Sequence, residues 1–146
     1  MSSVAGYSLP DGEGEHVAFS EAEFLVKAGA DTTGGAFTVI EERDPLDTPR
    51  HVHVHEDELF IVLEGEHVFE IGDREFAAGP GAVVFAPRGV PHAHRRAVPR
   101  TGRFLTLTSP AGFESFFREL AAAEQSDEPQ EEAYRGVSEK YGIAWG

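Results

Sequence analysis

Short apolar segments separated by turn residues fill the middle of this 146-residue sequence. The separators include Gly72-Asp73, Gly79-Pro80-Gly81 and Pro87-Arg88-Gly89, which favour tight chain reversals. Many short strands at this spacing are typical of an antiparallel sandwich or barrel. We therefore predict an all-β fold, with strands at residues 16–19, 24–27, 36–41, 50–54, 58–63, 67–71, 74–77, 82–86, 92–95 and 103–108.

The C-terminal part of the sequence has helical periodicity instead. Ser109-Pro110 favours a helix start, because a hydroxyl group can cap a helix and proline suits its first turn. Phe113, Phe116, Phe117 and Leu120 then recur three and four residues apart and form one apolar face. We expect this face to pack on the outside of the barrel rather than to line a ligand groove.

These segments are expected to form a single domain with three parts. The parts are an N-terminal arm with short strands over residues 1–33, a barrel core over residues 34–108, and a C-terminal helical appendage over residues 109–146. The appendage should contain a second short helix near residues 129–141, and Ile143 and Trp145 are candidates to anchor the tail.

Two sets of spaced residues stand close together in the barrel segment. The first reads His51-x-His53-x4-Glu58-x6-Gly65, and the second reads Gly81-x5-Pro87-x-Gly89-x2-His92. Residues two apart in a strand face the same side, so His51 and His53 point together, and Glu58 shares its face with Phe60 and Val62. Imidazoles and a carboxylate that meet on neighbouring strands indicate a metal site.

The ligand types limit the choice of metal only broadly. Imidazole nitrogen and carboxylate oxygen suit divalent iron, manganese, nickel, cobalt, copper or zinc, and we predict one such ion per chain. Four protein ligands leave open positions on a metal that prefers five or six. Open positions are typical of a catalytic site rather than a closed structural one.

Two stretches carry a family resemblance. Residues 48–65, TPRHVHVHEDELFIVLEG, and residues 79–94, GPGAVVFAPRGVPHAH, resemble the two motifs of the cupin family. Only 15 residues, 66–80, separate Gly65 from Gly81, which resembles small bacterial single-domain cupins. The resemblance implies a jelly-roll β-barrel, here with one or two short C-terminal α-helices. It also implies that the metal inside the barrel is held by His51, His53, Glu58 and His92.

Other residues are candidates for parts of the same site. His94 shares strand parity with His92, so it is a candidate catalytic residue beside Glu58, or a fourth imidazole ligand in place of Glu58. His55 could replace Glu58 only if its strand runs on, and a solvent-exposed turn position is favoured for it. His16 and His67 have no partner in the sequence and receive no role. The residues expected to face inward and sandwich a flat aromatic substrate are Phe60, Val62, Phe85 and Phe104.

Three functions stay open. The favoured one is a metal-dependent ring-opening dioxygenase that resembles the small bacterial quercetin dioxygenases, in which Glu58 would take a proton. The second is a zinc-dependent cyclase or isomerase of an aromatic polyketide pathway, resembling the monocupin cyclases of bacterial secondary metabolism, in which histidines would move protons. The third is a non-catalytic small-molecule-binding protein.

Charge and composition exclude other partners. The net charge of −14 argues against a nucleic-acid or anionic-membrane surface, and the absence of cysteine excludes disulfides and thiolate ligands. No apolar run approaches the ~20 residues of a membrane helix, and the N-terminus lacks a signal-peptide pattern, so a cytoplasmic protein is expected. Exposed strand edges favour a homodimer, in which the segment before Gly34 could supply an exchanged strand.

Overall fold

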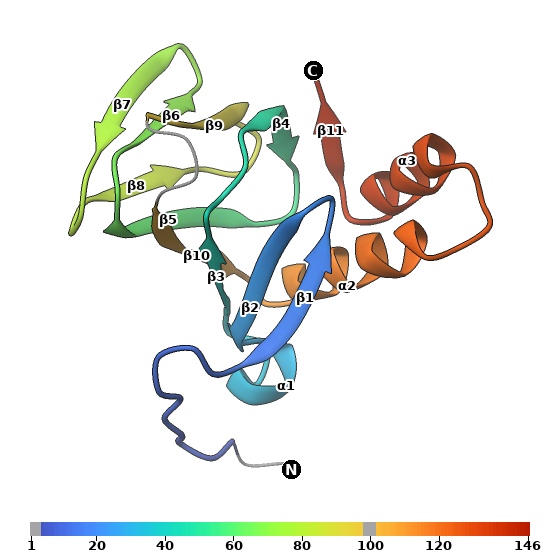
Figure 1. Cartoon of the computed structure of the whole chain (residues 1–146), viewed down its shortest axis with the longest axis horizontal. Coiled ribbons are helices and arrows are strands. Elements are labelled where there is room, and N and C mark those ends of the chain that lie inside the picture. Colours follow the sequence, from blue (N-terminus) through green and yellow to red (C-terminus); the bar gives the residue numbers. More distant parts are fainter. Residues whose placement is uncertain (1–3, 98–101) are drawn as a thin grey trace.

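The computed structural model of the chain describes residues 4–97 and 102–146. Its strands form two antiparallel sheets (Figure 1). The larger sheet has the order β1 (Glu15–Phe19), β2 (Ala22–Ala28), β3 (Thr38–Arg43), β10 (Arg103–Ser109), β5 (Asp57–Glu64) and β8 (Val83–Ala86). The smaller sheet has the order β11 (Ile143–Trp145), β4 (Thr48–His53), β9 (His92–Arg96), β6 (His67–Ile71) and β7 (Arg74–Ala78).

The described part of the chain also contains three helices: α1 (Ala30–Thr33), α2 (Phe113–Glu124) and α3 (Gln130–Lys140). The predicted jelly-roll class with C-terminal helices is confirmed, and the predicted strand bounds lie close to those observed. The sequence did not predict α1 or β11. Among the described residues, no helix has both the length and the apolar character needed to cross a membrane.

Strand alternation decides which side chains face the space between the sheets. Along β5 the residues at every second position, Glu58, Phe60 and Val62, are buried, whereas those between them are only partly covered. Phe104 and Thr106 on β10 follow the same rule. The interior of the larger sheet is therefore mainly apolar, with a few polar side chains at fixed places.

Two hydrophobic clusters fill this interior. The barrel cluster is Phe60, Val62, Phe69, Ile71, Ala78, Val84, Ala86 and Phe104. The tail cluster is Val17, Phe24, Val26, Ile40, Phe113, Phe116, Leu120 and Ile143. Fully burying one such large side chain contributes about 1.5–3 kcal/mol to stability. The tail cluster joins strands of both sheets to α2, so the C-terminal segment is part of the core.

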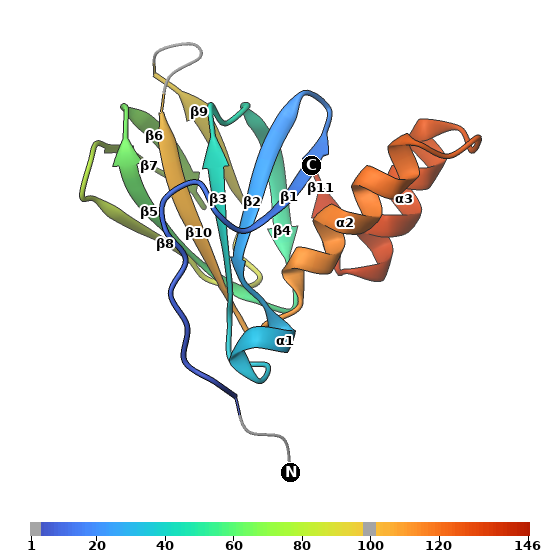
Figure 2. The same ribbon diagram turned by 60° about the horizontal axis from the view of Figure 1, so that its bottom comes forward.

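The N-terminal strands belong to the larger sheet of their own chain. β1 pairs with β2, and β2 pairs with β3, where Phe24 lies opposite Glu42. Figure 2 shows α2 and α3 alongside this β1–β2 hairpin. The homodimer and its exchanged strand stay a prediction.

The start of α2 differs from the prediction. Ser109 is the last residue of β10, where it pairs with Asp57, and its hydroxyl donates to Ala36 O at 3.2 Å. The helix begins at Phe113, with Gly112 as its N-cap. The predicted start at Ser109-Pro110 is wrong because the ladder to β5 holds Ser109 in the strand.

Glu114 fixes α2 to the sheet. Its buried carboxylate accepts hydrogen bonds from Thr38 Oγ1 at 2.5 Å, Ala30 N at 2.7 Å and Gly112 N at 3.0 Å. Burial alone would raise the pKa of Glu114, but these hydrogen bonds, Thr38 foremost, outweigh it and lower the pKa. The carboxylate therefore joins the starts of α1, β3 and α2.

Glu114→Gln should lower the free energy of unfolding by about 2 kcal/mol at pH 7, because hydrogen bonds to a charged group are worth roughly 1.5–3 kcal/mol. The folded-state pKa of Glu114 is lowered from 4.5, so this contribution is complete above about pH 4.5 and is lost as the pH falls through the folded pKa. Urea denaturation at pH 7 and pH 3 measures the difference, with the exposed Glu139→Gln as the control. A difference that persists unchanged at pH 3 contradicts this role.

Candidate metal centre and cavity

Four ligand atoms from three strands meet between the two sheets. His51 and His53 extend from β4, His92 extends from β9, and Glu58 extends from β5 of the opposite sheet. Their ligand atoms all lie within 4.8 Å of one another, and all four residues are buried. The structure thus brings together the four residues that the spacing singled out.

The outer nitrogen of each imidazole faces a hydrogen-bond acceptor. The acceptors are Pro49 O for His51 Nδ1 at 2.7 Å, Glu56 Oε1 for His53 Nδ1 at 2.6 Å, and Val90 O for His92 Nδ1 at 3.4 Å. A carbonyl or carboxylate oxygen can only accept, so Nδ1 of each ring carries the proton. Each Nε2 is therefore left with a lone pair.

These lone pairs point at one another. Nε2 of His51 lies 3.1 Å from Nε2 of His53, and Glu58 Oε2 lies 3.2 Å from His53 Nε2 and 2.6 Å from His92 Nε2. Glu58 Oε2 is buried, yet it has no hydrogen-bond donor within the described part of the chain. Its close contact with His92 supplies none, because that ring holds its proton on Nδ1. A cation would remove this repulsion.

The spacing of the atoms fits one metal ion. Two ligand atoms about 2.1 Å from the same ion lie roughly 3.0–3.4 Å apart, depending on the coordination geometry. The contacts of 3.1 and 3.2 Å around His53 agree with this range, whereas the 2.6 Å between Glu58 Oε2 and His92 Nε2 is shorter and would have to lengthen around a bound ion. The residues present therefore suit a divalent transition metal, which the two sheets would hold between them.

The protonation states of the cluster also suit a metal. Burial, with the neighbouring His92, lowers the pKa of His51 to about 4, so this imidazole is neutral near pH 7. Neutral imidazoles and a carboxylate are the forms that bind metals.

Neither His94 nor His55 is placed to replace Glu58. His94 Nδ1 donates to Leu46 O at 3.2 Å, and its Nε2 lies 3.0 Å from His67 Nδ1, so both ring nitrogens are engaged. Burial, reinforced by His67, lowers the pKa of His94 to about 4. His55 is exposed in the turn between β4 and β5, as the sequence favoured.

A cavity of about 460 Å³ extends from the ligand cluster. Phe60 and Phe104 line it from the barrel. From the C-terminal segment, the Phe113 ring lies 4.8 Å from His53, and the Trp145 ring lies 5.0 Å from His51. Small-molecule sites are typically apolar hollows of 300–1,000 Å³ with a few polar groups, and this cavity has that character.

The apolar face of α2 lines the cavity, which corrects the prediction that it packs on the outside of the barrel. The lining residues from this helix are Phe113, Phe116, Phe117 and Leu120. The Phe117 ring stacks on Phe24 of β2 at 4.3 Å, and Phe113 and Ile143 share one hydrophobic cluster. The helix thus fills the gap between β1–β2 of one sheet and β11 of the other. Periodicity identified the apolar face but could not show what it covers.

The four predicted substrate-binding residues have different environments. Phe60 and Phe104 line the cavity. Val62 is fully buried in the barrel cluster and does not line the cavity. Phe85 lies on the edge strand β8 with 54% of its surface exposed, so its predicted inward direction is wrong. On β8 the alternate residue Val84 faces inward instead.

Sequence reasoning missed three further polar residues. Glu56 orients His53, although the turn after β4 gave no sign of this contact. His67 is buried, and its strand parity was the only available signal for its contact with His94. Glu42 lines the cavity because β3 continues to Arg43, beyond the predicted strand end.

The comparisons with known proteins agree with this geometry. The family model for the cupin domain matches residues 39–108, which include all four ligand residues. The protein therefore carries a cupin domain. A search of curated proteins found no match.

Several solved structures are similar to this cupin in fold. KdgF from Halomonas sp. has a TM-score of 0.65 at 16% identity, over 76% of this chain and 99% of that chain. The polyketide cyclase RemF from Streptomyces resistomycificus has a TM-score of 0.61 at 23% identity, over 71% and 79%. Pac13, a nucleoside dehydratase from Streptomyces, has a TM-score of 0.59 at 16% identity, over 76% and 88%. At these identities the likeness shows the fold alone.

Each of the changes His51→Ala, His53→Ala and His92→Ala should lower the affinity for zinc by more than about 100-fold. Losing a residue that only hydrogen-bonds to a metal ligand typically costs roughly 10–100-fold, and losing the ligand itself should cost more. The reason is that each change removes one direct bond to the ion. Chelator competition and metal analysis of the purified variants measure the effect. His94→Phe is the matched control, since both nitrogens of that ring face away from the cluster, and it should retain zinc. Full zinc occupancy in all three alanine variants would rule out this site.

Proposed function

We propose that this cupin is a metal-dependent enzyme that binds an aromatic ketone or phenol and cyclises or isomerises it by moving protons. The observation that carries the proposal is the place of the ligand cluster, which lies in the wall of a largely aromatic cavity of about 460 Å³. A metal ligand set that faces such a space is arranged to act on a bound molecule rather than only to hold strands together.

Different residues of the chain would bind the metal and position the substrate. The ligand cluster would hold the ion, and a bound zinc ion would supply Lewis acidity toward a carbonyl or phenolate oxygen. Phe60 and Phe104 would orient a flat ring against one wall, while Phe113 and Trp145 would cover it from the C-terminal segment. Covering the substrate in this way excludes water and strengthens electrostatic interactions inside the cavity.

Two features favour proton chemistry over oxygen chemistry. The cavity wall carries ionisable side chains besides the ligands, among them His94 and Glu42. Proton transfer between carbon and oxygen needs such groups. The fold is also shared with RemF, described as a polyketide cyclase, and with Pac13, described as a nucleoside dehydratase. These likenesses support the proposal without deciding the substrate.

A ring-opening dioxygenase that resembles the quercetin dioxygenases is the second candidate. The four-ligand set favours it too, because open positions on the ion can take both a catechol oxygen and molecular oxygen. In that case the metal would be a redox-active ion such as iron, manganese, nickel, cobalt or copper.

Protein purified from its native host should contain about one zinc ion per chain. Loaded in turn with iron, manganese, nickel, cobalt or copper, it should consume no oxygen when quercetin is added, because the proposed chemistry transfers only protons. Metal analysis by mass spectrometry and an oxygen electrode make the two measurements. Oxygen uptake that matches the loss of quercetin would replace the proposal with the second candidate.

Trp145→Ala should weaken binding of 1,8-dihydroxyanthraquinone, a flat hydroxyketone probe, by about tenfold. An aromatic contact is worth about 0.5–1.5 kcal/mol beyond its buried area, and 1.4 kcal/mol is a factor of ten in affinity. Absorbance titration of the zinc-loaded protein measures the dissociation constant, and zinc content is measured in parallel. Phe85→Ala, which removes an exposed aromatic ring from the outer surface, is the control and should bind the probe normally. Equal affinity in both variants counts against the C-terminal segment as a cavity wall.

A further inference from the structure

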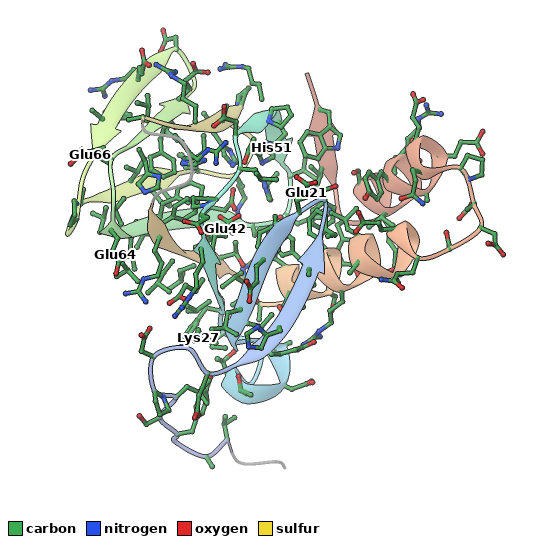
Figure 3. All side chains as sticks on the ribbon, in the orientation of Figure 1. Glu21, Lys27, Glu42, His51, Glu64 and Glu66 are labelled. Atoms are coloured by element: carbon green, nitrogen blue, oxygen red, sulfur yellow. The ribbon has the colours of Figure 1, made fainter. Side chains whose placement is uncertain are left out.

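Glu42 places a carboxyl group on the cavity wall contributed by the larger sheet. In the register of that sheet it lies between Phe24 of β2 and Phe104 of β10. All three residues line the cavity. Figure 3 labels Glu42 on β3 and His51 on β4, which belong to opposite sheets. A ligand held at the metal cluster therefore shares one cavity with this carboxyl group.

Few polar groups in the fold contact the carboxyl group of Glu42. Its only hydrogen bond from the described residues comes from Thr106 Oγ1, at a long 3.5 Å, and no salt bridge joins it to any of them. The adjacent Glu41 has a different environment. Glu41 points to the other face of the sheet, where Arg43 Nε donates to its carboxylate at 2.5 Å.

This difference argues against a structural role for Glu42. Glu42 is partly buried, and a carboxylate that only holds a fold together is normally paired or fully hydrogen-bonded, as the buried Glu41 and Glu114 are. Burial raises the pKa of Glu42 to about 8, and the charge of Glu58 contributes to the rise. Such a carboxyl group exchanges protons near neutral pH, and its carboxylate form is a stronger base than an exposed one.

Other ionisable groups on the wall are less suited to take a proton from a ligand. Both nitrogens of His94 are engaged by Leu46 and His67. The side chain of Asp47 is 65% exposed, and its carboxylate accepts a hydrogen bond from Arg96 N at 2.9 Å.

We propose that Glu42 is the acid–base residue of this cavity, which takes a proton from the carbon beside a ligand's carbonyl group and returns it. This inference rests on the proposed function of a metal-dependent enzyme for aromatic ketones. In the forward step the C–H bond breaks, its electron pair becomes the new C=C bond, and the carbonyl π pair moves to oxygen to give an enolate. The proton goes to the carboxylate of Glu42. The reverse step returns it, so no oxidant or further reactant is needed.

The test follows deuterium uptake by a probe rather than an unknown product. The probe is 1-acetyl-2-naphthol, whose phenol and carbonyl oxygens can bind zinc together and whose acetyl methyl group exchanges slowly in water. Zinc-loaded protein is mixed with the probe in D₂O, and NMR measures deuterium in the methyl group. The wild type should accelerate exchange. Glu42→Gln should remove about 100-fold or more of that acceleration, since general acid–base catalysis contributes typically 10²–10⁴-fold.

Parallel measurements separate this effect from loss of folding or of metal. Zinc content, melting temperature and probe affinity should be similar in Glu42→Gln and the wild type, because glutamine has the size of the neutral acid. Glu41→Gln is the matched control, since it changes the neighbouring carboxyl on the other face of the strand, and its folded, zinc-loaded form should exchange the probe at the wild-type rate. If the glutamine variant does not fold, Glu42→Asp decides: moving the carboxyl by about 1 Å should slow exchange at least tenfold.

The outcomes distinguish this inference from the proposed function. If the wild type holds no zinc, the metal-dependent function and the role of Glu42 both fail. If the wild type binds zinc and probe but does not accelerate exchange, or if the Glu42 variants exchange as fast as the wild type, Glu42 is not the acid–base residue and the metal site stands. A selective loss of exchange in the Glu42 variants supports the inference.

Discussion

The hydrogen bonds on the outer nitrogens of His51, His53 and His92 determine how the whole interior is arranged. Because each Nδ1 donates to a fixed oxygen, each Nε2 presents a lone pair to the same small space. Two of the acceptors are backbone carbonyls beside the ligands, so the strands themselves set the direction of the rings. The carboxylate of Glu58 arrives from the opposite sheet. The cluster is thus built from both sheets, and a cation bound there would join them.

Carboxyl groups inside this acidic protein have contrasting surroundings. Glu114 has three donors that bind α2 to the sheet, Glu41 has a guanidinium, and Glu58 has imidazoles and room for a cation. Within residues 4–97 and 102–146, the one hydrogen bond to Glu42 is a long contact from the Thr106 hydroxyl. Burying a carboxyl group without strong partners costs stability, and such costs are common where a side chain acts on a ligand. The comparison among these residues singles out Glu42 more clearly than its position alone.

Short-range periodicity predicted the strands of the barrel and the shared face of His51 and His53, and the resemblance to the cupin motifs added Glu58 and His92 to the ligand set. Two residues of spacing in a strand place His51 and His53 on one face whatever the rest of the chain does. The failed predictions depend on distant partners. The end of β3 is set by its ladders to β2 and β10, and stopping the strand at Glu41 hid Glu42. Packing between segments far apart in the sequence likewise decides whether Phe85 points inward or outward. It also decides which surface the apolar face of α2 contacts.

The metal ligands and much of the cavity wall come from different stretches of the chain, so they can change independently during evolution. All four ligand residues lie between positions 51 and 92, within the barrel. Much of the wall comes from outside that stretch, from Phe19 and Phe24 on one side and from α2, Tyr134 and Trp145 on the other. Substitutions in these flanking segments can reshape the space offered to a ligand while the metal-binding residues stay unchanged. Selectivity and reactivity can therefore evolve, or be engineered, on separate stretches of the same gene.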